Sequence, residues 1–238
     1  VGDGATIVGN GHKIIIYGDD YSTSKNTLIS GLTLLNSTIR VENSFGTTIQ
    51  NTVFENTSTG IEFANTKTWS EYNKIENCQF NNATEGIAFR TPVGNATGSY
   101  GSSQINRCSF NLRDFSVGIN VEYLAEFSDS QLQNVRFWLG KNNYSRANQT
   151  GILLNGAMDQ TLLFGVVFES FTPYPVYLFG IDLGENCTAA PIIDSGVSFL
   201  GNWTARIHNP FGEWIDGVGG VFQRQKVNVP VGLNNQYG

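Results

Sequence analysis

Charged residues are scarce in this 238-residue chain and make up 14% of it, against roughly 25% in ordinary soluble domains. The few basic residues are scattered and the net charge is −6, which makes nucleic acid a poor partner. No apolar run approaches the roughly 18 residues that a membrane-spanning helix needs, so we expect no membrane span. Because the chain begins with Val1 rather than Met, we expect a fragment or the mature form of a longer protein.

Residues that bind metals or form disulfides are also rare. The chain has 3 Cys and 2 His, namely Cys78, Cys108, Cys187, His12 and His208. None of them shows the spacing of a metal-binding motif. We therefore expect no metal and no other cofactor.

Small polar residues take the place of the missing charges. The chain contains 27 Gly and 26 Asn, a composition typical of many turns and polar strand faces. Apolar residues still make up 40%, including 16 Phe, which is enough for a continuous core and argues against disorder.

A pattern of the form aliphatic-x-(Asn/Gly)-x-x-Phe recurs at intervals of 20 to 31 residues. Its copies begin at Ile29, Ile49, Ile75, Ile105, Leu132 and Leu163, and a last copy with one extra residue runs from Ile193 to Phe199. The first copy has Leu in place of Phe, and the fourth has Arg107 at the turn position. Such self-similarity is the signature of a solenoid.

A second pattern, Gly-Ile-x-apolar, falls between successive copies of the first. It begins at Gly60, Gly86, Gly118, Gly151 and Gly180, with weaker copies at Ile39 and near Ile207. In the sixth repeat Val176-x-Leu178 competes with Gly180-Ile181, so two registers are open there. The apolar matches alternate with period two, which predicts strands.

The repeat predicts an all-β fold, a right-handed parallel β-helix of about seven three-strand rungs over residues 1–210. An antiparallel β-sandwich is the alternative, but it would not require the same residue types at the same repeat positions. Residues 211–238 leave the repeat, and we expect them to cap the coil or to contact a partner in an oligomer.

Stacked rungs place equivalent residues in columns. One column is aromatic and comprises Phe54, Phe80, Phe110, Phe137, Phe168 and Phe199. Cys78 and Cys108 become neighbours in a second column, where two packed thiols are favoured over a disulfide. Asn51, Asn77 and Asn134 are expected to adopt a left-handed turn conformation and to bond between coils.

The Asn51-type turn, the Phe54-type column and the Gly60-Ile61-type strand together resemble the pectin lyase-like superfamily of right-handed parallel β-helices. The resemblance covers roughly residues 1–210 and specifies fold more strongly than function. The superfamily includes pectate lyases, polygalacturonases, viral tailspikes and bacterial adhesins. In composition the chain is most similar to viral fibre and spike proteins, and trimers are common among such spikes.

The enzyme signatures of that superfamily are mostly missing. Polygalacturonase-like chains carry Asn-Thr-Asp, Asp-Asp, Gly-His-Gly and Arg-Ile-Lys. Here Asp19-Asp20 lies in the first coil, while Gly11-His12-Lys13 and Arg206-Ile207-His208 match only in part. The clustered Asp residues with which pectate lyases bind calcium are absent from the sequence.

Long connections flank the Gly-Ile strand, so we expect its outward face to form the floor of a binding groove. The candidate ligand-binding residues are Glu62, Arg90, Asn120, Glu122 and Asp182 on the floor, and Trp69, Trp138 and Tyr144 on the rims. Arg40, Glu42 and Asn155 share the floor, and Tyr72, Tyr100 and Tyr123 share the rims. Aromatic faces beside amides and carboxylates suit sugar rings. The bland alternative is an ordinary solvated sheet.

If the chain is an enzyme, Glu42 and Glu62 are the candidate catalytic residues. They lie on adjacent rungs, offset by two residues, which places their Cβ atoms roughly 8 Å apart. That separation overlaps the ~6.5–9.5 Å of inverting glycosidases, although any acidic pair on a sheet would qualify. Glu122, one rung above Arg90, is more simply explained as a cross-strand ion pair.

Eight Asn-x-Ser/Thr sequons exceed the number that chance gives. The glycosylation candidates are Asn36, Asn56, Asn82, Asn95, Asn143, Asn148, Asn186 and Asn202. The excess favours an extracellular or virion surface, although turns use Asn, Ser and Thr in any case. Asn36, Asn56 and Asn82 are equivalent by repeat, so glycans on all three would crowd.

The leading hypothesis is a viral tailspike or surface-adhesin β-helix that attaches to a cell-surface polysaccharide or a glycoprotein glycan without cleaving it. Its assembly could be a homotrimer. The first alternative is a polysaccharide lyase or glycoside hydrolase, and the second is a structural spike shaft that binds no sugar.

Overall fold

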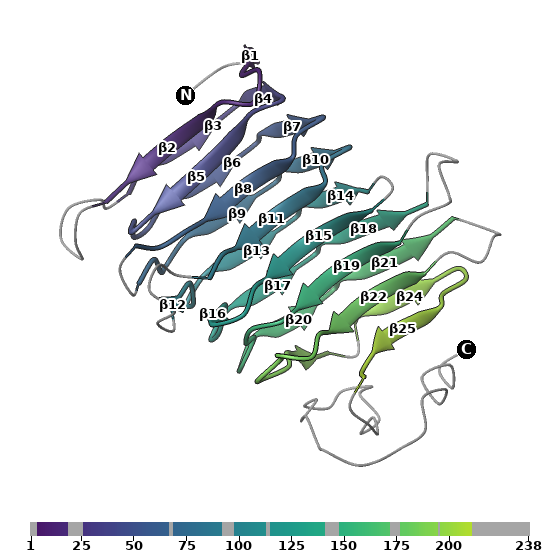
Figure 1. The fold of residues 1–238 in the computed structure, drawn as a ribbon. Helices are drawn as coiled ribbons and strands as arrows, with labels where there is room; N and C mark the ends of the chain where they lie inside the picture. The colour runs from purple at the N-terminus through teal and green to yellow at the C-terminus, as the bar shows by residue number, and fades with distance from the viewer. Residues whose placement is uncertain are drawn as a thin grey trace.

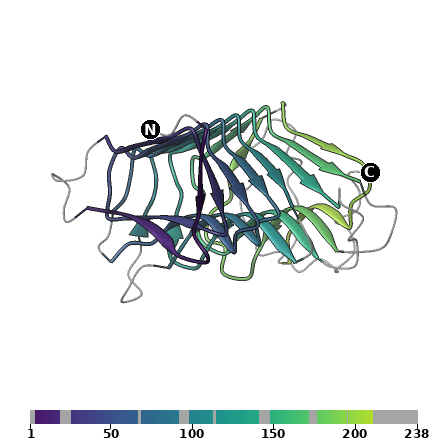
Figure 2. The ribbon, with the colours of Figure 1, turned by 90° about the horizontal axis from the view of Figure 1, so that it is seen from above.

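The computed structural model describes residues 4–18, 26–66, 69–91, 98–112, 115–140, 148–171, 177–194 and 196–210. Three parallel β-sheets run side by side along the molecule, and each rung contributes one strand to each sheet (Figure 1). Figure 2 shows the rungs stacked one behind another from the N-terminal to the C-terminal end. The described residues contain no helix, and therefore none that could cross a membrane.

The first and second sheets have eight strands each. The first sheet comprises β1 (Ala5–Val8), β4 (Leu32–Leu35), β7 (Val53–Glu55), β10 (Gln79–Asn81), β14 (Ser109–Asn111), β18 (Arg136–Leu139), β21 (Val167–Ser170) and β24 (Ser198–Leu200). The second sheet comprises β2 (Lys13–Tyr17), β5 (Thr38–Glu42), β8 (Thr59–Phe63), β11 (Glu85–Phe89), β15 (Ser116–Val121), β19 (Gln149–Leu154), β22 (Leu178–Leu183) and β25 (Ala205–His208).

The third sheet has seven strands, and a fourth sheet is short. The third comprises β3 (Leu28–Ser30), β6 (Thr48–Gln50), β9 (Lys74–Glu76), β13 (Gln104–Asn106), β17 (Gln131–Gln133), β20 (Leu162–Phe164) and β23 (Ile192–Ile193). The fourth pairs β12 (Gly98–Ser99) with β16 (Ala125–Glu126) at the corner between the second and third sheets.

The predicted parallel β-solenoid is confirmed, and the expected seven rungs come close to the observed number. The first two sheets hold one strand more than seven, because β1 and β2 add a partial rung at the N-terminal end. The open register is also settled: Ile181 pairs with Ile152, so Gly180-Ile181 is the repeat of Gly151-Ile152. Residues 211–238, predicted as a cap or oligomer contact, lie outside the described residues.

The predicted phenylalanine column forms the axis of the core. Neighbouring ring centroids are 4.8, 4.6, 4.7, 4.8 and 4.9 Å apart from Phe54 to Phe199, and the rings are nearly parallel. The spacing equals that of the strands themselves, so each ring stacks on the equivalent ring of the next rung. Five of the six rings are fully buried, and Phe199 in the last rung is partly exposed.

The glycine of each Gly-Ile strand makes room for this column. A Cβ atom at Gly118 would lie 2.5 Å from Phe137 Cε1 and 2.6 Å from the carbonyl oxygen of Gly151. The same close approach to a Phe ring recurs at Gly60, Gly86, Gly151 and Gly180. The two sequence patterns are therefore coupled: the glycine of one rung accommodates the phenylalanine of the next.

The predicted left-handed turns are present at Asn51, Asn77 and Asn134, whose φ angles are 51°, 53° and 54°. Arg107, at the same repeat position, adopts φ 53° without the tolerance of Asn. The expected bond between coils also exists, because Asn77 Nδ2 donates to Asn51 Oδ1 at 2.7 Å.

A ladder of small polar residues, not anticipated from the sequence, connects the rungs before the third sheet. The amide N–H of Thr47 donates to Asn73 Oδ1 at 3.0 Å, Asn73 donates to Ser103 Oγ at 3.0 Å, Ser103 to Ser130 Oγ at 3.0 Å, and Ser130 to Thr161 Oγ1 at 3.3 Å. All five residues are buried. Each side-chain oxygen thus satisfies a buried backbone donor that has left the sheet ladder.

Cys78 and Cys108 lie side by side in the core as free thiols, as predicted. Burial raises the pKa of the Cys108 thiol, and the neighbouring Cys78 raises it further. The Cys108 thiol therefore stays protonated, and both side chains pack as small apolar groups.

Candidate functional site

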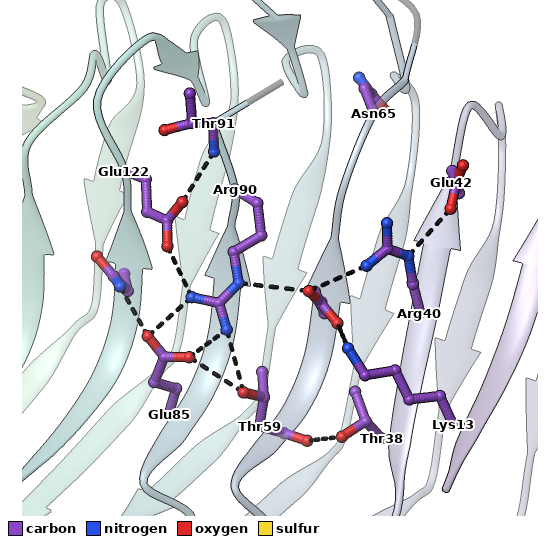
Figure 3. Close-up of polar contacts among 12 residues, drawn as sticks. Lys13, Thr38, Arg40, Glu42, Thr59, Asn65, Glu85, Arg90, Thr91 and Glu122 are labelled. Carbon is purple, nitrogen blue, oxygen red and sulfur yellow. Dashed lines mark hydrogen bonds and ion pairs between the residues drawn. The ribbon is translucent and has the colours of Figure 1, made fainter. Parts of the chain in front are cut away.

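The outward face of the second sheet carries a connected network of ion pairs and hydrogen bonds (Figure 3). Ile61 and Phe63 of β8 point into the core, so Glu62 between them points outward. Arg40 of β5 lies directly beside Glu62 in the strand register. Arg90 directly follows the last residue of β11, and Glu122 directly follows the last residue of β15. These two strands are neighbours in the sheet. We call this surface, from Lys13 to Glu122, the polar face.

Glu62 is the centre of the N-terminal half of the polar face. Its Oε2 accepts from Lys13 Nζ at 2.5 Å, while Oε1 lies 3.3 Å from Arg40 Nη1 and 3.5 Å from Arg90 Nε. These cations cover the carboxylate and leave only 8% of the side chain exposed. Both carboxylate oxygens are thus committed to charge-assisted contacts.

Arg90 joins Glu62 to the next rungs. Its guanidinium pairs with Glu85, with Glu122 at 2.8 Å, and donates to Thr59 Oγ1 at 3.2 Å. Glu122 also accepts from the amide of Thr91 at 2.9 Å. The predicted ion pair between Arg90 and Glu122 is confirmed.

Glu85 and Arg90 perturb each other. Burial alone would raise the pKa of Glu85, but hydrogen bonds from Arg90, Asn120 and Thr59 and the charge of Arg90 lower it below the ordinary 4.5. Asn120 contributes through its Nδ2, which donates to Glu85 at 2.7 Å. Burial would lower the pKa of Arg90, but its carboxylate partners raise it. Both groups are therefore held in their charged forms.

The candidate catalytic pair has the predicted register, with Glu42 two residues along from the position opposite Glu62. Arg40 lies between them, because its Nε donates to Glu42 Oε2 at 3.0 Å and its Nη1 to Glu62. A general acid or base must reach the proton that it transfers. Here the carboxylate oxygens of Glu62 reach cations instead, which gives a hydrolytic role no geometric support.

Exposed aromatic side chains follow the polar face at the corner toward the third sheet. Trp69, Tyr72 and Tyr123 are 50%, 54% and 50% exposed. Trp69 forms a bridge with Ser99 of β12, and Thr91 Oγ1 donates to the carbonyl oxygen of Tyr123 at 2.6 Å. We call these three residues the aromatic edge.

The backbone at Tyr72 has φ 59°, a left-handed conformation that is costly for a bulky residue. The residue at the same turn position is also left-handed in other rungs, at Gly46, Ser102, Asp129 and Gln160. The conformation of Tyr72 therefore belongs to the repeating turn of the solenoid.

Tyr100 was expected on the rim, and that prediction is wrong. The side chain is fully buried, 5.5 Å from Phe89 and 6.2 Å from Phe63 between ring centroids. Its hydroxyl donates to the carbonyl oxygen of Arg90 at 2.7 Å and accepts from the amide of Asn65 at 3.1 Å. Burial accordingly raises the pKa of Tyr100. Tyr100 therefore packs in the core and holds the backbone of Arg90 and Asn65 in place through its hydroxyl.

Trp138 was expected on the rim of the groove beside the Gly-Ile strand, but it lies on β18 in the first sheet. Phe137 and Leu139 point into the core, so Trp138 points outward. Its Nε1 donates to Glu169 at 3.1 Å, and Arg136 lies 5.8 Å from the ring centroid. Trp138 therefore belongs to another face than Glu62. Tyr144 lies outside the described residues.

Asp182 lies on the second sheet, two rungs beyond Asn120. Its Oδ1 is 2.7 Å from His208 Nδ1, and the His208 ring stacks on Phe179 at 4.8 Å. Leu153 separates this pair from Asn120 in the column. Asp182 thus lies on the same sheet as the polar face but pairs with His208.

Three of the six described sequon asparagines occupy left-handed turns. Asn36, Asn56 and Asn82 adopt φ angles of 47°, 53° and 56° between the first and second sheets. Asn148, Asn186 and Asn202 are exposed, and Asn95 and Asn143 lie outside the described residues. The left-handed turn explains the first three asparagines by itself, and occupancy by glycans stays a prediction.

Sequence reasoning missed three members of the polar face: Lys13, Thr59 and Glu85. A signal existed for Glu85, because it immediately precedes Gly86-Ile87 and so aligns with Thr59 one rung earlier. Lys13 offered none, since its partner Glu62 lies two rungs away. Within the described residues, no three His, Cys, Asp or Glu side chains are grouped so that they could hold a metal ion.

Comparisons with known proteins show only distant likenesses. No family model and no curated protein matches the chain. The fold is similar to a structure of PfbA, a surface protein and adhesin of Streptococcus pneumoniae, with 13% identity and a TM-score of 0.49 over 87% of this chain and 73% of that chain. A second PfbA structure gives 12% identity and a TM-score of 0.49 over 86% and 66%.

A further likeness is to QnrB1, a plasmid-mediated fluoroquinolone resistance protein, with 14% identity and a TM-score of 0.24 over 82% of this chain and 89% of that chain. At such identities and scores the likenesses concern the fold alone. Function must be argued from the side chains.

Proposed function

We propose that this chain is the β-solenoid of a surface attachment protein, either an adhesin or a viral tailspike, that binds cell-surface carbohydrate without cleaving it. Its ligand would be a polysaccharide or a glycoprotein glycan, and its location the cell exterior or a virion surface. Membership in the pectin lyase-like superfamily is part of this proposal. So is assembly as a homotrimer, in which residues 211–238 would cap the solenoid or contact further copies.

The observation that carries the proposal is the aromatic edge beside the polar face. Trp69 and Tyr123 each expose half of their surface, next to a face of carboxylates and amides held rigidly by ion pairs. Sugars present apolar ring faces and hydroxyl edges, which suit stacking and hydrogen bonding respectively. A rigid surface also lowers the entropic cost of binding.

The lyase or hydrolase alternative receives less support. Glu62 directs both of its carboxylate oxygens at cations, and Arg40 occupies the space between Glu42 and Glu62. The structural-shaft alternative remains a competing prediction, because it requires only the core and the sheets.

A glycan array tests the proposal. The wild-type chain should bind a subset of immobilised cell-surface glycans, and Trp69→Ala should weaken that binding about tenfold, which is about 1.4 kcal/mol. Phe164→Ala is the matched control, because Phe164 is an exposed aromatic residue on β20 of the third sheet. Absence of binding to any glycan would support the structural shaft, and equal losses in both variants would rule out the aromatic edge.

A further inference from the structure

Among the described residues, every cation of the polar face is paired with a carboxylate. Lys13 is paired with Glu62, Arg40 with Glu42 and Glu62, and Arg90 with Glu62, Glu85 and Glu122. Four carboxylates thus face three cations. A carboxylate or sulfate group on a ligand would meet paired cations only, and would have to displace a glutamate in order to bind one.

The competition for Arg90 is especially unfavourable to an anionic ligand. Its guanidinium is three-quarters covered, with 23% of the side chain exposed, and already contacts three carboxylates and one hydroxyl. A guanidinium can hold a ligand carboxylate through two parallel hydrogen bonds. In Arg90 the N–H groups that would form these bonds already contact glutamates of the protein.

The aromatic edge is acidic as well. Ser99 lies between Trp69 on one neighbouring rung and Glu126 of β16 on the other. The Ser99 hydroxyl donates to the carboxylate of Glu71. Partial burial raises the pKa of Glu126, and the charge of Asp159 raises it further. Glu71 and Glu126 therefore add negative charge beside the described residues of the aromatic edge.

We infer that the glycan recognised by the polar face and the aromatic edge is neutral, composed of uncharged hexose-type rings rather than uronic, sialic or sulfated sugars. This inference rests on the proposed function. Carboxylate, amide and hydroxyl oxygens of the face accept hydrogen bonds from sugar hydroxyls, while Trp69 and Tyr123 stack on the rings. Acidic polysaccharides would meet four carboxylates and three cations in the described ion-pair network, where none of these cations is unpaired.

The test compares neutral oligosaccharides with their own carboxymethylated and sulfated derivatives. Affinities are measured by titration calorimetry at about 0.01 and 1 M salt, where screening lengths are about 30 and 3 Å. Each neutral oligosaccharide that binds should do so with a dissociation constant that changes less than about twofold with salt. Its charged derivatives should bind at least about tenfold more weakly at low salt and recover partly at high salt.

Glu122→Gln provides a second readout, because it removes one carboxylate partner of Arg90. In this variant the charged derivatives should bind less weakly relative to the neutral parent, so the ratio of the two dissociation constants at low salt should be smaller than in the wild-type chain. Charged derivatives that bind the wild-type chain as tightly as the neutral parent at low salt would overturn the inference and leave the proposed function standing. Failure of every neutral and charged oligosaccharide to bind would overturn the proposed function and the inference with it.

Discussion

At the scale of single residues, a glycine and a phenylalanine on neighbouring rungs depend on each other. Gly118→Ala would place a Cβ atom 2.5 Å from Phe137 Cε1 and 2.6 Å from a backbone carbonyl oxygen. We expect a loss of about 1–3 kcal/mol in the free energy of unfolding, as for other overpacked cores, measured by urea denaturation. The double variant with Phe137→Leu should lose less than the sum of the two single losses. Additive losses would contradict the coupling.

Asn77 tests the turn column in the same way. Its φ of 53° suits Asn and Gly but not a β-branched residue. Asn77→Gly gives up only an exposed bond to Asn51, so it should be more stable than Asn77→Val by about 1–2 kcal/mol. Equal unfolding midpoints for the two variants would remove the left-handed turn from the account.

At the scale of elements, the small polar ladder fastens the entry of each third-sheet strand. Ser130→Ala would leave the buried amide of Ser103 without its acceptor, at a cost of about 1–3 kcal/mol in thermal or urea unfolding. Ser109→Ala is the control, because Ser109 lies on the outward side of β14, where a surface substitution costs within about 0.5 kcal/mol. A loss at Ser130 no larger than at Ser109 would show that the ladder contributes nothing.

The polar face, which joins five strands of the second sheet from β2 to β15, predicts sensitivity to acid. The folded-state pKa of Glu85 lies below its unfolded value of about 4.5. Its contribution to stability is therefore complete above that value and is lost as the pH falls through the folded-state pKa. Unfolding free energies measured from neutral pH downward should fall in that window, and Glu85→Gln should flatten the fall. An unchanged pH profile in Glu85→Gln would contradict the role assigned to the ion pairs.

How far the sequence predicts each element depends on whether its neighbours recur. The phenylalanine column, the left-handed turns and the Gly-Ile strands recur in most rungs, so period and spacing suffice to find them. The ion pairs do not repeat from rung to rung. Lys13 reaches across two rungs to Glu62. Arg90 pairs with three carboxylates, and the sequence predicted only its pair with Glu122. The prediction that Tyr100 lies on the rim failed because its side chain folds from a long connection back into the core.

At the scale of the whole molecule, the solenoid separates its two tasks. The inward columns stabilise the stack, and because they are uniform they say nothing of function. The outward residues differ from rung to rung. The charges lie over β2 to β15 of the second sheet, with the aromatic edge beside them. A ligand lying over this surface would contact several rungs at once without any rearrangement of the core.

The central claim is binding without cleavage, and a reducing-end assay on a bound glycan tests it most directly. The glycan retained by the wild-type chain is incubated with it, and new reducing ends and unsaturated products are measured over time. We predict that neither product accumulates while the glycan stays bound, because Glu62 is committed to Lys13, Arg40 and Arg90. Release of fragments by the wild-type chain that disappears in Glu62→Gln, with binding retained, would contradict the account and identify an enzyme.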